Sequence, residues 1–152
     1  MLAEDPIIKR HLWGALNPKW QVPITPPLKY VYFGVTGSEP CLNYEECVRR
    51  IQAVQRFHMI ACPDIRFNFV IGGDLRIYEG RGWDYQPGLS NDYRRLIPKS
   101  LYIGYIGNFR KEPDQAPRYD VTPEMISLAN SLVLLALENG ILDKYFIKED
   151  LF

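Results

Sequence analysis

Two short runs of alternating apolar residues meet at Gly72-Gly73-Asp74, within the stretch from residue 66 to residue 83. Both runs are rich in β-branched and aromatic side chains, which favour extended strands. A tight hairpin turn needs a positive φ, and glycine adopts one without strain. The stretch therefore predicts a β-hairpin. A hairpin alone indicates no function, because hairpins occur in every fold that contains β-structure.

The rest of the chain reads as alternating strands and helices. We predict a strand over residues 29–35, a helix capped by Asn43 that ends near Met59, a strand over residues 101–106, and a helix capped by Thr122 that ends at Asn139. The expected buried side of the second helix is Ile126, Ala129, Leu132, Val133 and Ala136. Residues 1–28 hold five prolines and little periodicity, and residues 84–100 look like a long connection, so both are predicted to be irregular.

This order of elements is typical of an α/β or α+β domain with a mixed sheet. A chain of 152 residues fits one domain, so we predict a single domain over residues 1–152. Its 18 basic and 18 acidic side chains cancel, which gives no reason to expect nucleic acid or an anionic membrane as a partner. The first residues lack the pattern of a secretory signal. We expect any signal or membrane anchor to lie outside this chain.

The chain holds three cysteines. Cys41 and Cys47 are close enough in sequence for a disulfide, but two reduced, buried thiols fit the spacing equally well. Cys62 is then left over. His58, Cys62 and Asp64 could be read as metal ligands, but Pro63 interrupts the helix, and a histidine beside a lone small cysteine is the commoner arrangement. We therefore expect no cofactor.

The string Tyr78-Glu79-Gly80-Arg81-Gly82-Trp83 resembles the YEGRGW motif of peptidoglycan-recognition proteins, a family related to the bacteriophage-type zinc amidases. Trp13-Gly14-Ala15 resembles another segment of the family, and similar matches in the same order cover most of the chain. The resemblance implies an α/β fold with a central mixed β-sheet flanked by helices, and a Cys41–Cys47 disulfide. It also implies a groove that holds zinc in amidase members and a muropeptide in receptor members.

The same resemblance implies that this chain has lost its enzymatic centre. Gly34 stands where the family has its first zinc-binding histidine, and Phe67 stands where it has a catalytic tyrosine. The segment 145–150 resembles the strand that leads to the second histidine, and Asp150 takes that place. A catalytic zinc needs about three protein ligands and an open position for water. We therefore predict that the chain is not an enzyme.

Three residues are candidate muropeptide contacts by resemblance. His58 stands where the family contacts sugar, although its helix spacing suits a core histidine equally well. Arg81 stands where members that prefer diaminopimelate-type peptidoglycan place an arginine, because a guanidinium pairs well with a carboxylate; a solvated surface charge is the alternative. Trp83 closes the same motif. Cys62-Pro63 replaces a Gly-Trp pair of such receptors, and residues 84–100 are longer than usual, which predicts a degraded or blocked groove.

Three functions follow as hypotheses. We favour a regulatory pseudoreceptor of innate immunity that pairs with a related peptidoglycan-recognition receptor and does not grip muropeptide. The alternatives are a noncatalytic receptor for diaminopimelate-type fragments and a zinc-dependent N-acetylmuramoyl-L-alanine amidase. The altered groove positions resemble those of insect members of the LF type, which implies negative regulation and a membrane-anchored, extracellular domain.

Overall fold

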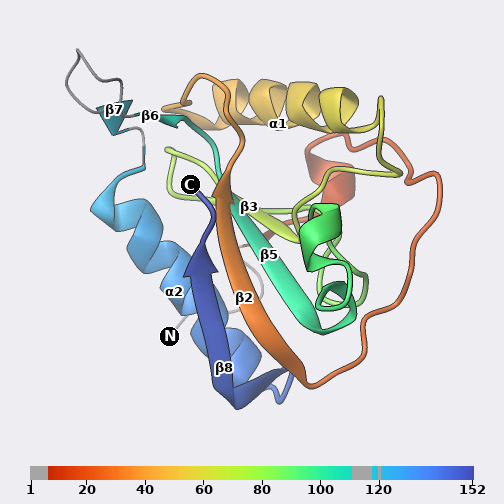
Figure 1. The fold of residues 1–152 in the computed structure, drawn as a ribbon. Helices are drawn as coiled ribbons and strands as arrows, with labels where there is room; N and C mark the ends of the chain where they lie inside the picture. The colour runs from red at the N-terminus through yellow and green to blue at the C-terminus, as the bar shows by residue number, and fades with distance from the viewer. Residues whose placement is uncertain (1–6, 111–117, 120) are drawn as a thin grey trace.

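The computed structural model describes residues 7–110, 118–119 and 121–152, so residues 1–6 of the predicted irregular segment lie outside it. A six-stranded mixed sheet runs through the molecule in the order β1-β4-β3-β5-β2-β8 (Figure 1). Its strands are β1 (Ile7–Ile8), β2 (Leu28–Val35), β3 (Phe69–Ile71), β4 (Ile77–Glu79), β5 (Ser100–Tyr105) and β8 (Leu142–Asp150). The helices are α1 (Tyr44–His58) and α2 (Pro123–Glu138), and a small separate sheet joins β6 (Phe109–Arg110) to β7 (Arg118–Tyr119).

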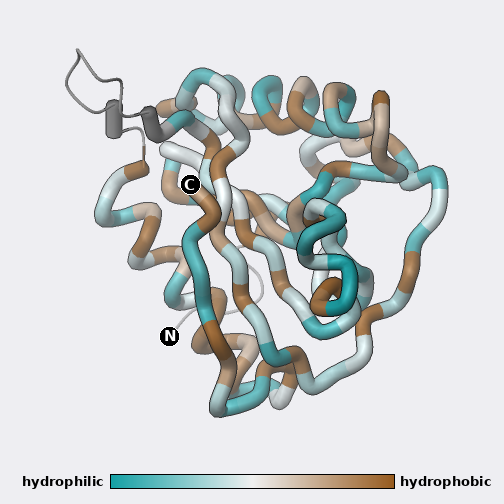
Figure 2. The backbone as a smooth tube through the Cα atoms, viewed as in Figure 1, coloured by the Kyte–Doolittle hydropathy of each residue, from teal (hydrophilic) through white to brown (hydrophobic). Residues whose placement is uncertain are grey.

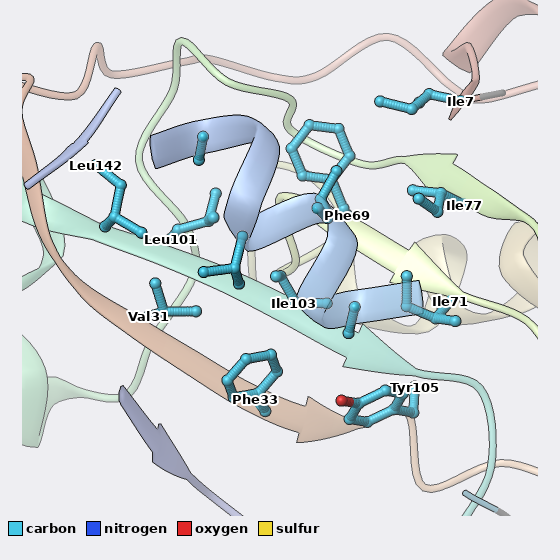
Figure 3. Close-up of a cluster of buried hydrophobic side chains, with 14 of the residues drawn as sticks. Ile7, Val31, Phe33, Phe69, Ile71, Ile77, Leu101, Ile103, Tyr105 and Leu142 are labelled. Carbon is cyan, nitrogen blue, oxygen red and sulfur yellow. The ribbon is translucent and has the colours of Figure 1, made fainter. Parts of the chain in front are cut away.

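The two helices cover opposite faces of the sheet. Helix α2 packs against one face, where Val31, Phe33, Leu101 and Ile103 meet its apolar side (Figure 3). Helix α1 packs against the other face through the following buried residues: Cys47, Ile51, Val54, Phe67, Val70 and Tyr78. Side chains alternate between the two faces along each strand. The central mixed sheet flanked by helices is therefore confirmed.

The predicted hairpin is confirmed, but our reason for its glycines is wrong. Strands β3 and β4 pair antiparallel around the turn. The residue with a positive φ is Leu75, at 61°, and neither Gly72 nor Gly73 adopts one. A Cβ on Gly73 would overlap the carbonyl oxygen of Cys41. The glycine is needed because the turn lies directly against the Cys41 loop.

Local signals placed both helices correctly. The Asn43 side chain accepts a hydrogen bond from the Glu46 N–H at 2.9 Å, and the Thr122 side chain caps α2 in the same way. The predicted stripe of α2 is wrong at its first member, because Ile126 is 43% exposed and Met125 is buried instead. The buried residues then follow at intervals of four and three from Met125, as a helix requires.

The N-terminal segment is less irregular than predicted. Strand β1 pairs in parallel with β4, and a 3-10 turn follows over Arg10–Leu12. Trp13 is fully buried, and its Nε1 donates to the Glu79 carbonyl at 2.9 Å. Short 3-10 turns over Asn91–Tyr93 and Ile97–Lys99 interrupt the connection from residue 84 to residue 100. Among the described residues no helix has the length and apolar character to cross a bilayer.

Candidate functional site

Two glycines, Gly34 and Gly104, lie side by side on the face of the sheet that carries α1, and we call them and the rings above them the floor. Gly34 of β2 and Gly104 of β5 are register partners, so their missing side chains would point to the same side of the sheet. The Tyr102 hydroxyl lies 2.5 Å from where a Cβ on Gly34 would be, and the Phe67 ring lies 2.6 Å from that of Gly104. The rings of Tyr102 and Phe67 pack against each other with centroids 4.6 Å apart. Two aromatic rings thus fill the space above both glycines.

Neither aromatic ring above the two glycines carries a charge at neutral pH. Burial raises the pKa of the Tyr102 hydroxyl, with a smaller opposing effect from Arg66. The Tyr102 side chain therefore stays protonated and neutral. Phe67 supplies a ring with no hydroxyl, so neither aromatic group offers an anion to a metal or a base to a water molecule.

His58 closes one side of this floor as a neutral imidazole. Its Nδ1 accepts a hydrogen bond from the Arg66 N–H at 3.0 Å, and its ring centroid lies 5.7 Å from that of Phe67. Burial, together with the positive charges of Arg66 and Arg81, lowers the pKa of His58 to about 4. Because Nδ1 is the acceptor, the proton of the neutral ring is assigned to Nε2. His58 can therefore donate one hydrogen bond, and it lines the two hollows beside the C-terminal end of α1.

Arg81 is held by backbone carbonyls. Its Nε donates to the Ile65 carbonyl at 2.6 Å and its Nη1 to the Gln86 carbonyl at 2.9 Å. A Cβ on Gly88 would lie 2.8 Å from Arg81 Nη2, so the connection after the hairpin covers the guanidinium closely. Arg81 thus fastens that connection to the hairpin, and it is not the solvated surface charge that we considered as the alternative. A role in ligand binding stays a prediction.

Asn68 positions the motif that contains Arg81. Its side-chain nitrogen donates to the carbonyls of Gly82 and Tyr85, and its side-chain oxygen accepts from the Tyr102 N–H. Asn68 is almost fully buried. It therefore ties the hairpin to β5, and our reading of the sequence assigned it no role.

The remaining two predicted positions lie outside the floor. Trp83 packs on Phe69, with ring centroids 4.5 Å apart, and belongs to the core under α2. Asp150 is the register partner of Phe33, whose side chain also points toward α2. Burial raises the pKa of Tyr105 to about 12, and the negative charge of Asp150 adds a smaller contribution. Gly34 and Asp150 thus lie on adjacent strands but are not register partners.

An open depression of about 430 Å³ remains beside the filled floor. Arg66, Tyr93, Tyr102 and Glu149 are among its lining residues. Tyr93 comes from the connection after the hairpin and packs edge-on against Tyr32, with centroids 5.0 Å apart. This connection forms a wall of the depression, and Arg66 is tied to it by a bond from Nε to the Gly88 carbonyl at 2.7 Å.

Our sequence reading missed Arg66, Tyr93 and Tyr102 as groove residues. A usable signal existed for one of them, because Tyr102 and Gly104 alternate along one strand as Tyr32 and Gly34 do along another. The contact between Tyr102 and Gly34 depends on strand register, which no local pattern specifies.

These positions do not fit a zinc centre. Gly34 has no donor atom, Phe67 has no hydroxyl, and Asp150 pairs in register with Phe33 and not with Gly34, at the rim of the depression. In the ranges that the structure describes, no three side chains of His, Cys, Asp or Glu gather closely enough to hold a metal ion. The Cys41–Cys47 disulfide is confirmed, with Cα atoms 5.1 Å apart, and Cys62 is a free thiol.

The relatives found by comparison with known proteins are peptidoglycan-recognition proteins. No family model matches the chain. Peptidoglycan-recognition protein SC1a of Drosophila melanogaster is 32% identical over 143 residues, which cover 93% of this chain and 72% of the relative. The solved peptidoglycan recognition protein LE, in complex with tracheal cytotoxin, a monomeric diaminopimelic acid-type peptidoglycan, is 31% identical with a TM-score of 0.82. It matches over 96% of this chain and 82% of that one.

A second solved structure holds tracheal cytotoxin bound to the ectodomain complex of the recognition proteins LCa and LCx. One of its chains is 29% identical to this chain with a TM-score of 0.80, over 95% of this chain and 82% of that one. These matches distinguish no member type, so the likeness to the LF type stays a prediction.

Proposed function

This chain belongs to the peptidoglycan-recognition protein family, and we propose that it is a noncatalytic member that regulates innate immunity by pairing with a related receptor. One observation carries the proposal: the Tyr102 hydroxyl occupies the space that a side chain at Gly34 would need. An imidazole at that position has no room beside the tyrosine ring. The loss of the phenol at Phe67 and the register of Asp150, which pairs with Phe33 and not with Gly34, support the same conclusion.

The muropeptide groove is proposed to bind its usual ligand poorly or not at all. The Arg81 guanidinium donates Nε and Nη1 to the Ile65 and Gln86 carbonyls, and its remaining nitrogen, Nη2, is buried without a partner beside Gly88, so a ligand carboxylate could reach it only if this connection moved. Trp83 packs on the core side of the sheet. Of the three candidate contacts, His58 keeps an N–H at Nε2 beside the hollows at the end of α1, and Arg81 keeps one buried nitrogen, Nη2, without a hydrogen-bond partner.

A disulfide is stable in oxidising compartments, so the Cys41–Cys47 bond supports an extracellular domain. A membrane anchor outside this chain is part of the proposal, as in a cell-surface ectodomain. Pairing is proposed by analogy with the LCa and LCx ectodomain complex.

A second candidate function is a noncatalytic receptor for diaminopimelate-type fragments. The open depression of about 430 Å³ favours it, because an unfilled concave surface lined by Arg66, Glu149 and Asp150 offers both charges to a fragment that carries amine and carboxylate groups. Isothermal titration with tracheal cytotoxin separates the two functions, with the ectodomain of recognition protein LE as positive control. We expect no heat of binding for this chain. Saturable binding at micromolar concentration or below would favour the receptor.

Pairing is tested separately by sedimentation of this chain with the LCa and LCx ectodomains, with and without tracheal cytotoxin. A new, larger species with either ectodomain is the expected result. If both mixtures sediment as separate components, the pairing part of the proposal is wrong.

A further inference from the structure

Large apolar side chains gather at the C-terminal end of α1. Phe57 is 73% exposed and Ile60 is 79% exposed. The segment after the first 3-10 turn runs beside them (Figure 1) and adds Trp20 at 61% and Leu16 at 46%. We call these four residues the α1-end surface.

Hydrogen bonds hold the two halves of this surface together. The Lys19 N–H donates to the Pro63 carbonyl and its Nζ to the Met59 carbonyl, both at 2.8 Å. Leu16 is held in the same way, since its N–H donates to Gln55 Oε1 at 2.9 Å. Apolar segments of the two stretches lie near each other at this end of α1 (Figure 2). Clustered exposed apolar side chains on a folded domain typically mark an interaction surface.

Phe57 stands between two hollows. One, of about 190 Å³, is lined by Phe57, Ile60, Cys62 and Arg66, and the other, of about 240 Å³, lies between α1 and the loop at Gly37. Each has the size of one or two side chains. Interface hot spots form where an apolar side chain of one partner fills such a pocket of the other.

The surroundings of this surface are basic. Between residues 49 and 66 the exposed or partly exposed charged side chains are Arg49, Arg50, Arg56 and Arg66, and Lys19 adds a charge at Met59. Arg66 also faces the depression that Glu149 and Asp150 line. The single carboxylate in that range, Asp64, is 2% exposed and bonded to Arg10 at 2.9 Å. The whole chain has no net charge, so this end of α1 is positive against a neutral background. An acidic partner complements it.

We propose that the α1-end surface docks an acidic protein surface that inserts an apolar side chain into the hollow beside Phe57. The inference rests on the proposed function, because it supplies the surface through which a protein partner binds. A protein fits better than a lipid bilayer, since a bilayer offers no projecting side chain for the hollows. The hollow of about 190 Å³ is also lined by His58, so a docked partner would cover the histidine end of the groove.

The test is an NMR titration of the isotope-labelled chain with a blocked acidic hexapeptide in which Leu-Trp lies between two pairs of glutamates. The control peptide has lysines in place of the glutamates. Saturable shifts at Phe57, Ile60 and Arg66 with the acidic peptide alone are expected. Shifts elsewhere, equal shifts with both peptides, or none would overturn the proposal.

Matched variants identify the surface. Phe57→Ser and Ile60→Ser should each weaken peptide binding about tenfold or more, since truncated anchors lose most of their binding energy. Leu42→Ser is the control, because Leu42 is 80% exposed but precedes the other end of α1. Equal losses in all three variants would contradict the assignment.

Co-sedimentation with phosphatidylglycerol vesicles tests the lipid alternative. Vesicle binding that Phe57→Ser abolishes, without any peptide binding, would replace the protein partner by a membrane. None of these probes contains muropeptide or zinc, so failure here leaves the tests of the noncatalytic function unaffected.

Discussion

At the scale of single residues, Gly34 and Tyr102 compete for one space. A Cβ on Gly34 would lie 2.5 Å from the Tyr102 hydroxyl and 2.9 Å from its ring, which is closer than real contacts allow. Gly34 has no positive φ, so its backbone alone would accept alanine. The Tyr102 ring, and not the backbone conformation, therefore excludes a side chain at position 34.

This competition predicts a coupling between two substitutions. Gly34→Ala alone should lower the free energy of unfolding by roughly 1 to 3 kcal/mol, because it overpacks the floor. In a Tyr102→Ala background the same change should cost little, since the space is then free. Urea unfolding of the four proteins measures the coupling. Additive effects would mean that Tyr102 does not fill the site.

His58 makes stability depend on pH. Its pKa of about 4 in the folded chain lies below the ordinary value of 6.5. Between these values the unfolded chain binds more protons, so the free energy of unfolding falls as pH falls from 6.5 to 4. We expect a loss of roughly 1 to 2 kcal/mol after allowing for solvent screening of the ring.

His58→Asn should remove this loss, because asparagine keeps an acceptor for the Arg66 N–H but does not titrate. The control is His11→Asn, at the chain's other histidine, which is exposed. Chemical unfolding curves at several pH values between 4 and 7 measure how the free energy of unfolding of each variant depends on pH. A pH dependence that survives in His58→Asn, or disappears in His11→Asn, contradicts the assignment.

At the scale of elements, close contacts between segments far apart in sequence hold the groove together. The hairpin turn rests on the Cys41 loop, and Arg10 of the N-terminal segment reaches the loop that follows α1 and the residue that follows β4. Arg10 donates to Asp64 Oδ2 at 2.9 Å and to the Gly80 carbonyl at 2.7 Å. Gln55 of α1 donates to the other oxygen of Asp64 at 3.0 Å.

Removal of the Asp64 carboxylate should therefore be costly. Asp64→Ala removes the nearly buried carboxylate that Arg10 and Gln55 share and leaves the Arg10 charge with carbonyl partners alone, which we expect to cost about 3 to 5 kcal/mol. Lys9→Ala is the control, since its ion pair with Glu79 spans 3.9 Å and is partly exposed; it should cost at most about 1 kcal/mol. Chemical denaturation compares them, and similar costs would show that the Asp64 network contributes little.

The hairpin turn predicts opposite effects at two neighbouring positions. Gly73→Ala should destabilise by roughly 1 to 3 kcal/mol, because its Cβ meets the Cys41 carbonyl. Leu75→Gly should stabilise by about 1 kcal/mol, since Leu75 has a φ of 61°. Thermal unfolding of both variants checks the signs. A neutral Gly73→Ala would indicate that the Cys41 loop moves aside freely.

At the scale of the whole molecule, local signals were enough for the two helices, the hairpin, β2 and β5, but not for β1, which was predicted to be irregular. Asn43 and Thr122 mark the helix starts, and alternation marks β2 and β5, because these signals act within a few residues. The site was harder to predict, since it depends on register. The pairing of β8 with β2 shifts between Leu28 and Tyr30, so no count along the sequence could show which residue of β2 pairs with Asp150.

The same limit applies to the residues that fill the groove. Tyr102 reaches Gly34 because β2 and β5 are in register, and Arg81 meets the Gln86 carbonyl because the following connection folds back. The family resemblance identified positions that changed, but not what replaced them in space. Only the packed structure relates each missing side chain to the neighbour that occupies its place.

The most direct measurement is the zinc content and activity of the protein. The chain should be incubated with one equivalent of zinc, passed through a desalting column, analysed for bound metal by native mass spectrometry, and assayed with tracheal cytotoxin for release of the stem peptide. The filled floor above Gly34 predicts no retained zinc and no released peptide. One tightly held zinc ion per chain, with zinc-dependent release of peptide, would contradict the noncatalytic function.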